Sequence, residues 1–178
     1  EADFAVFTAF FSIAGILVVG AGARYQYAIV LPKKDSEAIQ LFSLSIYITI
    51  GYSILLIVAV WLFHNMVNHT IGNGVYFIPL YILFFGFWTS FSILSVRMKS
   101  FFQNAIAKVL QSMFYILSAV GLGLLNYTFF GLIAGKILGV IVSWIYLLNK
   151  SSFGFTLARF KDLKGIAVKY QDYPKYGL

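Results

Sequence analysis

Residues 109–149 read VLQSMFYILSAVGLGLLNYTFFGLIAGKILGVIVSWIYLLN, and this stretch decides the fold class of the protein. It contains a single charged side chain, Lys136, and one short polar turn at residues 126–128. On either side of that turn, an apolar run of about 20 residues is long enough to cross the roughly 30 Å hydrocarbon core of a bilayer as a helix. The stretch therefore predicts a hairpin of two transmembrane helices.

Three further apolar runs precede this hairpin, so the chain predicts an all-α, polytopic bundle of five transmembrane helices. The expected spans are about residues 4–30, 41–63, 75–96, 104–125 and 129–149. Of the 178 residues 61% are hydrophobic and 11% charged, whereas a soluble domain carries about 25% charged residues. Residues 150–178 predict a basic amphipathic segment followed by a loop.

The basic residues are distributed unevenly along the chain. There are 13 Lys and Arg against 6 Asp and Glu, a net charge of +7. With Arg24 and Lys136 set aside, every other basic residue falls in the first, third or last connection, and none falls in residues 64–74 or 126–128. This pattern indicates membrane topology rather than nucleic-acid binding. The positive-inside rule places the basic connections in the cytoplasm, with the first residue outside and the last inside.

The first residues do not resemble a signal peptide, because Glu1 and Asp3 are acidic where a signal peptide is basic. An outward start together with five spans leads us to expect one further helix before Glu1. The sequence is therefore expected to be part of a longer protein.

Two basic residues break the charge pattern and are the leading candidates for function. Arg24 ends the first long apolar run, where it either snorkels to the interface or faces a cavity and holds an anion; its neighbours Tyr25 and Gln26 suit both interpretations. Lys136 lies within the fifth span, where insertion costs about 2.5–3.5 kcal/mol. It either snorkels outward or faces a cavity that attracts phosphate or another anion.

Small and polar residues in the last two spans suggest how these helices pack. Gly131, Gly135 and Gly139 recur every four residues and form a smooth ridge, which favours close helix packing. Asn104 and Gln111 place amides in the fourth span, where they bind either sugar hydroxyls or a neighbouring helix.

The residues needed for several kinds of chemistry are missing. The chain has no Cys, no phosphate-binding loop, no nucleophile elbow and no HExxH motif. His64 and His69 are five residues apart, which is not the spacing of a helical metal pair. All acidic residues lie outside the apolar runs, at positions 1, 3, 35, 37, 162 and 172. We therefore predict no catalytic, metal or cofactor site, and no carboxylate-driven ion coupling within the spans.

Three segments, in their order and spacing, resemble the polysaccharide flippases of the multidrug/oligosaccharidyl-lipid/polysaccharide exporter superfamily, which includes the O-antigen translocases. They are residues 24–32 (RYQYAIVLP) with Glu37 and Ala38, residues 97–101 (RMKSF) with Ala105 and Ala107, and residues 131–139 (GLIAGKILG) with 170–176 (YQDYPKY). Members of this family often have an acidic residue where Gln26 stands, which leaves a coupling role for this position open.

The resemblance implies that the chain is helices two to six of a transporter with 12–14 helices in two lobes. The implied substrate is an oligosaccharide on a polyprenyl diphosphate carrier, moved across the bacterial or archaeal cytoplasmic (inner) membrane by alternating access during polysaccharide or O-antigen (lipopolysaccharide) biosynthesis. The implied partners are membrane lipid, a coupling proton or sodium ion, and a carboxy-terminal lobe. The candidate substrate-binding residues are Arg24, Tyr25, Gln26, Asn104, Gln111 and Lys136.

Other functions remain open at this point. Multidrug and peptidoglycan-precursor exporters belong to the same superfamily. A polytopic polysaccharide polymerase or ligase would need reactive groups in an outer loop, for which His64 and His69 are the candidates. A purely structural membrane subunit is a further alternative.

Overall fold

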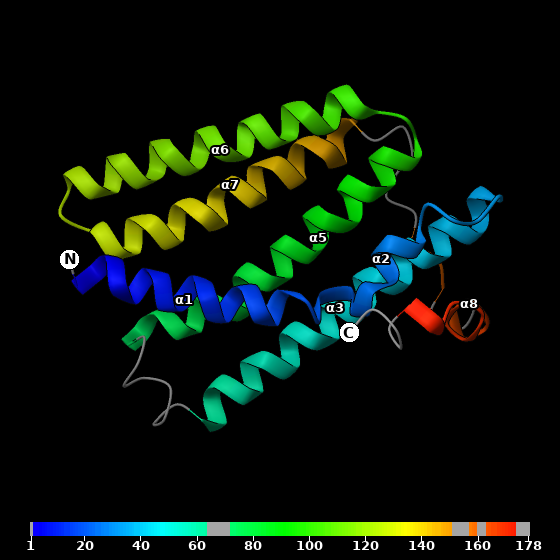
Figure 1. Ribbon diagram of the computed structural model, residues 1–178, viewed down its shortest axis with the longest axis horizontal. Helices are drawn as coiled ribbons and strands as arrows, with labels where there is room; N and C mark the ends of the chain where they lie inside the picture. The colour runs from blue at the N-terminus through cyan, green and yellow to red at the C-terminus, as the bar shows by residue number, and fades with distance from the viewer. Residues whose placement is uncertain (1, 64–71, 151–156, 160–162, 174–178) are drawn as a thin grey trace.

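The computed structural model describes residues 2–63, 72–150, 157–159 and 163–173, and the regular structure in these ranges is helical (Figure 1). The elements are α1 (Ala2–Val18), η1 (Ala21–Arg24), α2 (Tyr25–Ala28), α3 (Asp35–Leu62), η2 (Gly72–Tyr76), α5 (Phe77–Arg97), α6 (Phe101–Leu124), α7 (Thr128–Lys150) and α8 (Leu163–Lys169). The all-α prediction is confirmed. His64 and His69 lie outside the described residues.

The helices match the predicted spans, with changes in the first and second. Helices α3, α5, α6 and α7 are each long and apolar enough to cross a membrane, and α1 with η1–α2, bent by 47°, counts as a fifth when the bent pair is taken as one span. The second span starts at Asp35 rather than near residue 41. Asp35 and Glu37 stand in its first turn, where the helix dipole favours negative charge. The chain is therefore a multi-pass helical membrane protein.

Successive long helices run in opposite directions, so their connections alternate between two ends of the bundle (Figure 1). The connections at residues 29–34 and 98–100 and helix α8 lie at one end, which we call the basic end because it carries Lys33, Lys34 and Lys99. The start of α1 and the turn at residues 125–127 lie at the other end, where the turn has no charged side chain. The fold thus gathers the basic connections on one side, as the sequence predicts.

Helices α6 and α7 form the predicted hairpin, and the glycine ridge of α7 faces α6. A Cβ added to Gly135 would lie 2.9 Å from the carbonyl oxygen of Tyr115, and one added to Gly139 would lie 2.5 Å from that of Gln111. Gly131 is buried at the same seam, where an added Cβ would lie 2.8 Å from the Leu122 side chain and 3.5 Å from the nearest α6 backbone atoms. The ridge therefore lets two backbones approach more closely than any side chain would allow.

Arg97, at the end of α5, fastens the connection between the first two spans. Its guanidinium donates hydrogen bonds to the carbonyl oxygens of Ile29 (3.1 Å) and Pro32 (2.7 Å) and forms an ion pair with Asp35 (2.8 Å). The side chain of Arg97 is 12% exposed, so these charge-assisted bonds are partly shielded from water. The sequence pattern used Arg97 as a topology marker and as part of the resembling segment 97–101, and it did not predict these contacts.

Helix α8 docks on the basic end through α3 and α2. Lys169 forms an ion pair with Glu37 (2.8 Å), and the Tyr25 hydroxyl donates to the carbonyl oxygen of Ala167 (3.1 Å). The hydrogen bond to Glu37 raises the pKa of Lys169 above the usual lysine value of 10.5. The same contact lowers the pKa of Glu37. The ion pair is therefore formed through neutral pH, and its contribution to docking is lost as the pH rises past the raised pKa of Lys169 or falls past the lowered pKa of Glu37.

Substituting a ridge glycine tests the packing of the hairpin. Gly139→Ala should lower the free energy of unfolding by about 1–3 kcal/mol, because the new methyl group meets backbone that cannot move aside. Gly121→Ala is the matched control on α6, because nothing lies within 4 Å of its added Cβ. Denaturation midpoints in detergent measure both, and equal midpoints would contradict the proposed close contact.

Replacing Arg97 tests whether its hydrogen bonds and ion pair keep residues 29–34 in place. Arg97→Met loses charge-assisted bonds worth about 1.5–3 kcal/mol, so local opening should rise roughly 10- to 100-fold. Trypsin cleavage after Lys33 and Lys34 reports that opening. Lys99→Met is the control, since it also removes one basic residue at the basic end, and it should leave the cleavage rate unchanged.

Candidate functional site

The first span is broken in its second half by a left-handed stretch of backbone. After α1 ends at Val18, Gly22, Ala23 and Arg24 adopt φ of 67°, 44° and 62°. For a non-glycine residue this conformation costs about 1–2 kcal/mol. Irregular backbone at membrane depth is tolerated where it is buried in protein or lines a cavity. Such a break therefore marks a position at which to look for a site.

Neighbouring helices surround the break closely. An added Cβ at Gly20 would lie 2.8 Å from the ring of Tyr52 on α3, and one at Gly22 would collide with the side-chain amide of Gln26. Position 22 therefore favours glycine for two reasons: its φ is positive, and there is no space for a side chain. The sequence Gly20-Ala21-Gly22-Ala23 permits this path because it has almost no side-chain volume.

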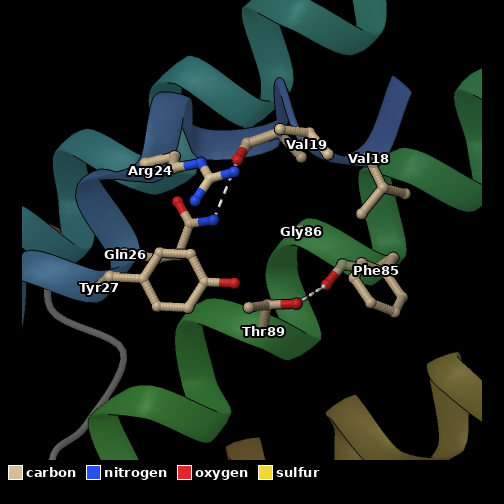
Figure 2. Close-up of a pocket in the computed structure, with 9 residues that line it drawn as sticks. Val18, Val19, Arg24, Gln26, Tyr27, Phe85, Gly86 and Thr89 are labelled. Atoms are coloured by element: carbon tan, nitrogen blue, oxygen red, sulfur yellow. Dashed lines mark hydrogen bonds between the residues drawn. The ribbon is translucent and has the colours of Figure 1, made fainter. Parts of the chain in front are cut away.

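A cavity of about 120 Å³ lies between the break and α5 (Figure 2). Its lining residues are Val18, Val19, Ala21, Arg24, Gln26 and Tyr27 on one side and Phe85, Gly86 and Thr89 on the other. Gly86 is the tenth residue of α5, so the cavity lies about 14 Å from one end of that helix and about 17 Å from the other. The sequence placed Arg24 at the inner end of its span. The break instead brings it beside the middle of α5.

The polar groups of this cavity are only partly paired. Gln26 is 7% exposed, and its Nε2 donates to the carbonyl oxygen of Ala21 at 3.1 Å. Its Oε1 is buried and has no hydrogen-bond partner in the described part of the chain. Thr89 is already occupied, since its hydroxyl donates to the carbonyl oxygen of Phe85 at 2.8 Å. A buried acceptor without a partner costs about 1–3 kcal/mol.

Arg24 supplies the charge at this wall, where Figure 2 shows its guanidinium group together with the amide of Gln26 and the ring of Tyr27. Among the described residues, Arg24 forms no ion pair and no side-chain hydrogen bond. Its guanidinium offers five N–H donors, and Gln26 Oε1 offers an acceptor. The arrangement suits an anionic group that carries a hydroxyl or another donor beside it.

Two other predicted site residues form hydrogen bonds to neighbouring helices. Tyr25 is buried and points to α8, where its hydroxyl bonds Ala167. Asn104 on α6 accepts a hydrogen bond from the Ser92 hydroxyl of α5 (2.8 Å) and donates to its carbonyl oxygen (3.4 Å). Of the two interpretations open for Asn104, the structure has the bond between helices. Neither residue lines the Arg24 cavity.

Lys136 and Gln111 lie elsewhere in the bundle. The Lys136 ammonium sits 4.1 Å from the ring centroid of Tyr115 on α6 and 4.9 Å from that of Phe11 on α1. Phe11 precedes Val18 by seven residues, or about 10 Å of helix, so Lys136 and the Arg24 cavity are separate. Each cation–π contact is worth about 0.5–2 kcal/mol, depending on how far it is desolvated, so the two together offset part or all of the 2.5–3.5 kcal/mol insertion cost of a lysine. The side chain of Gln111 is half-buried beside the hairpin seam.

The sequence did not predict the α5 residues that line the cavity, which are Phe85, Gly86 and Thr89. Their signal was weak, because a glycine and a threonine in an apolar helix are common. Gly86 allows α3 to pack closely against α5, because the side chain of Thr49 on α3 would lie 2.5 Å from a Cβ added at this position. Within the described ranges, no group of three or more His, Cys, Asp or Glu side chains is placed to hold a metal ion.

Comparisons with protein families, with curated proteins and with solved structures found no match for this chain. Its class therefore follows from the fold and the hydropathy alone: a multi-pass α-helical membrane protein whose first span is broken beside a cavity.

The strain at the break can be measured directly. Ala23→Gly should raise the free energy of unfolding by up to about 1 kcal/mol, because relief of a left-handed alanine exceeds the loss of one half-buried methyl group. Ala9→Gly, in the regular part of α1, should lower it by about 1 kcal/mol. Thermal unfolding in detergent compares the two, and a shift of the same sign would contradict a strained break.

Proposed function

We propose that this chain forms the amino-terminal lobe of a flippase that moves polyprenyl-diphosphate-linked oligosaccharide across the cytoplasmic membrane by alternating access. The observation that carries the proposal is the Arg24 cavity at a broken span, at the depth of the middle of α5. Broken helices beside a midplane site are the usual construction of secondary transporters. The resemblance of residues 24–32, 97–101 and 131–139 to polysaccharide flippases supplies the substrate class.

The chemistry of the cavity fits a diphosphate. A guanidinium binds phosphoryl oxygens through paired, charge-assisted hydrogen bonds, which offset the cost of taking the anion out of water. Gln26 Oε1 then accepts from a hydroxyl next to the phosphate, such as one on the first sugar. Because the cavity holds only about 120 Å³, the remaining sugars would occupy space outside it, between the two lobes.

The side of the membrane follows from charge. The basic end carries Lys33, Lys34, Lys99, Lys164 and Lys169 and would face the cytoplasm under the positive-inside rule. In this orientation the first described residues lie outside and α8 lies inside. The carrier would then enter from the cytoplasmic leaflet, where lipid-linked sugars are assembled, and leave on the far side.

A peptidoglycan-precursor exporter is the second candidate, and the same observation favours it, since that substrate carries the same polyprenyl diphosphate. A multidrug exporter fits less well, because Arg24 would repel a cationic drug and the apolar runs contain no carboxylate to attract one. A polymerase or ligase would use an outer loop, whereas the Arg24 cavity lies near the middle of the bundle.

Transport in vesicles tests the proposal. In the whole protein reconstituted into liposomes, Arg24→Gln should slow the crossing of polyprenyl-diphosphate oligosaccharide by roughly 10- to 100-fold, the equivalent of charge-assisted bonds worth about 1.5–3 kcal/mol. Lys33→Gln, which removes an exposed charge at the basic end, should leave the rate unchanged. Competition between oligosaccharide and peptidoglycan precursors separates the two candidates. An unaltered rate in Arg24→Gln would rule out this site.

A further inference from the structure

Lys136 presents a charge within the membrane that the described chain does not neutralise. It is the ninth residue of α7, about 12 Å along the helix from the end opposite the basic end. Its ammonium lies over the rings of Tyr115 and Phe11, which come from two different helices. Among the described residues it forms no ion pair and no hydrogen bond. Aromatic rings attract the charge but leave its three N–H donors without an acceptor.

The hairpin provides a second group without a partner nearby. Gln111 stands one turn of α6 before Tyr115, and its backbone faces Gly139, one turn of α7 beyond Lys136. The half-buried amide of Gln111 has no hydrogen bond within the described ranges. Gln111 therefore places a second polar side chain within one helical turn of the Tyr115 ring that Lys136 contacts.

No acidic side chain of this sequence lies within an apolar run, so a carboxylate at the depth of Lys136 has no source in the described spans. The acidic residues are at positions 1, 3, 35, 37, 162 and 172, all outside the apolar runs. The nearest along α1 is Asp3, which precedes Phe11 by eight residues, or about 12 Å of helix. Lipid phosphates lie at the membrane surface and not at this depth. Intramembrane lysines usually face the bundle interior or a water-filled cavity and pair with another ionisable group or with backbone carbonyls; among the described residues Lys136 has neither kind of partner.

We infer that the face of the bundle formed by Phe11, Tyr115 and Lys136 is a docking site for a transmembrane helix that lies outside residues 1–178 and carries an Asp or Glu at this depth. The carboxylate accepts hydrogen bonds from Lys136 and Gln111, and the rings of Phe11 and Tyr115 flank it. Helix α6 leaves room for such a neighbour, because only 6% of its membrane-spanning window is buried within the described chain. This site is independent of the Arg24 cavity and of the proposed transport.

Photo-crosslinking in native membranes tests the inference on the whole protein. Benzoylphenylalanine replaces Phe11, whose ring is 39% exposed and touches Lys136. The control probe replaces Leu138, which is 44% exposed and lies two residues along α7 on another face. The Phe11 probe should capture a peptide containing an Asp or Glu within an apolar run, and the Leu138 probe should capture lipid.

Charge variants then decide whether the carboxylate causes docking. Lys136→Met should lower the yield of the Phe11 adduct at least fivefold, whereas Lys136→Arg, which keeps the charge, should retain it. Lys136→Glu should abolish the adduct, and exchange of the captured acid for Lys should restore it. A yield unchanged in Lys136→Met, or lipid adducts alone at Phe11, would overturn the inference. Loss of transport in Lys136→Met without any helix adduct would instead assign the lysine to the transported anion.

Discussion

The architecture depends on one constraint, that backbone N–H and C=O groups inside a bilayer must find partners within the protein. Four of the spans satisfy it as continuous helices. The first span interrupts its own helix, and short turn bonds replace the lost ones: Gly20 donates to Leu17 (3.1 Å) and Ala23 donates to Gly20 (3.1 Å). The Gln26 amide takes up the carbonyl oxygen of Ala21 (3.1 Å). The break is thus stable only because side chains and neighbouring helices complete it.

Helices α3 and α5 and the side chain of Arg97 stabilise this break. Helices α3 and α5 press together through small polar residues, where Ser45 and Ser90 share a hydrogen bond of 3.0 Å and Gly86 admits Thr49. Such contacts are close because little side-chain volume separates the backbones. Arg97 then binds Ile29, Pro32 and Asp35, which come just after α2. The short segment between the break and α3 is therefore held in place at its far end as well.

Arg24 and Lys136, the two basic residues within the spans, have different surroundings and are therefore suited to different ligands. Arg24 lies at a cavity with a free acceptor beside it, which suits a small polar anion. Lys136 lies between aromatic rings at the side of the hairpin, which suits a carboxylate on a packed helix. The proposed roles differ accordingly, with Arg24 assigned to the transported anion and Lys136 to the docking of a helix.

The sequence by itself determined the four continuous spans, the alternation of their direction, the gathering of basic connections at one end and the glycine seam of the hairpin. These follow from apolar length, charge placement and a four-residue period, which are properties of local sequence. Only the tertiary structure decided that the first span breaks, that Arg24 and Gln26 meet Phe85 and Thr89, and that Arg24 and Lys136 stand apart. The physical reason is that glycine and alanine at residues 20–23 merely permit a left-handed turn. Whether the chain takes that turn depends on Tyr52, Thr49 and Gly86, which come from helices distant in sequence and act only once the bundle is packed.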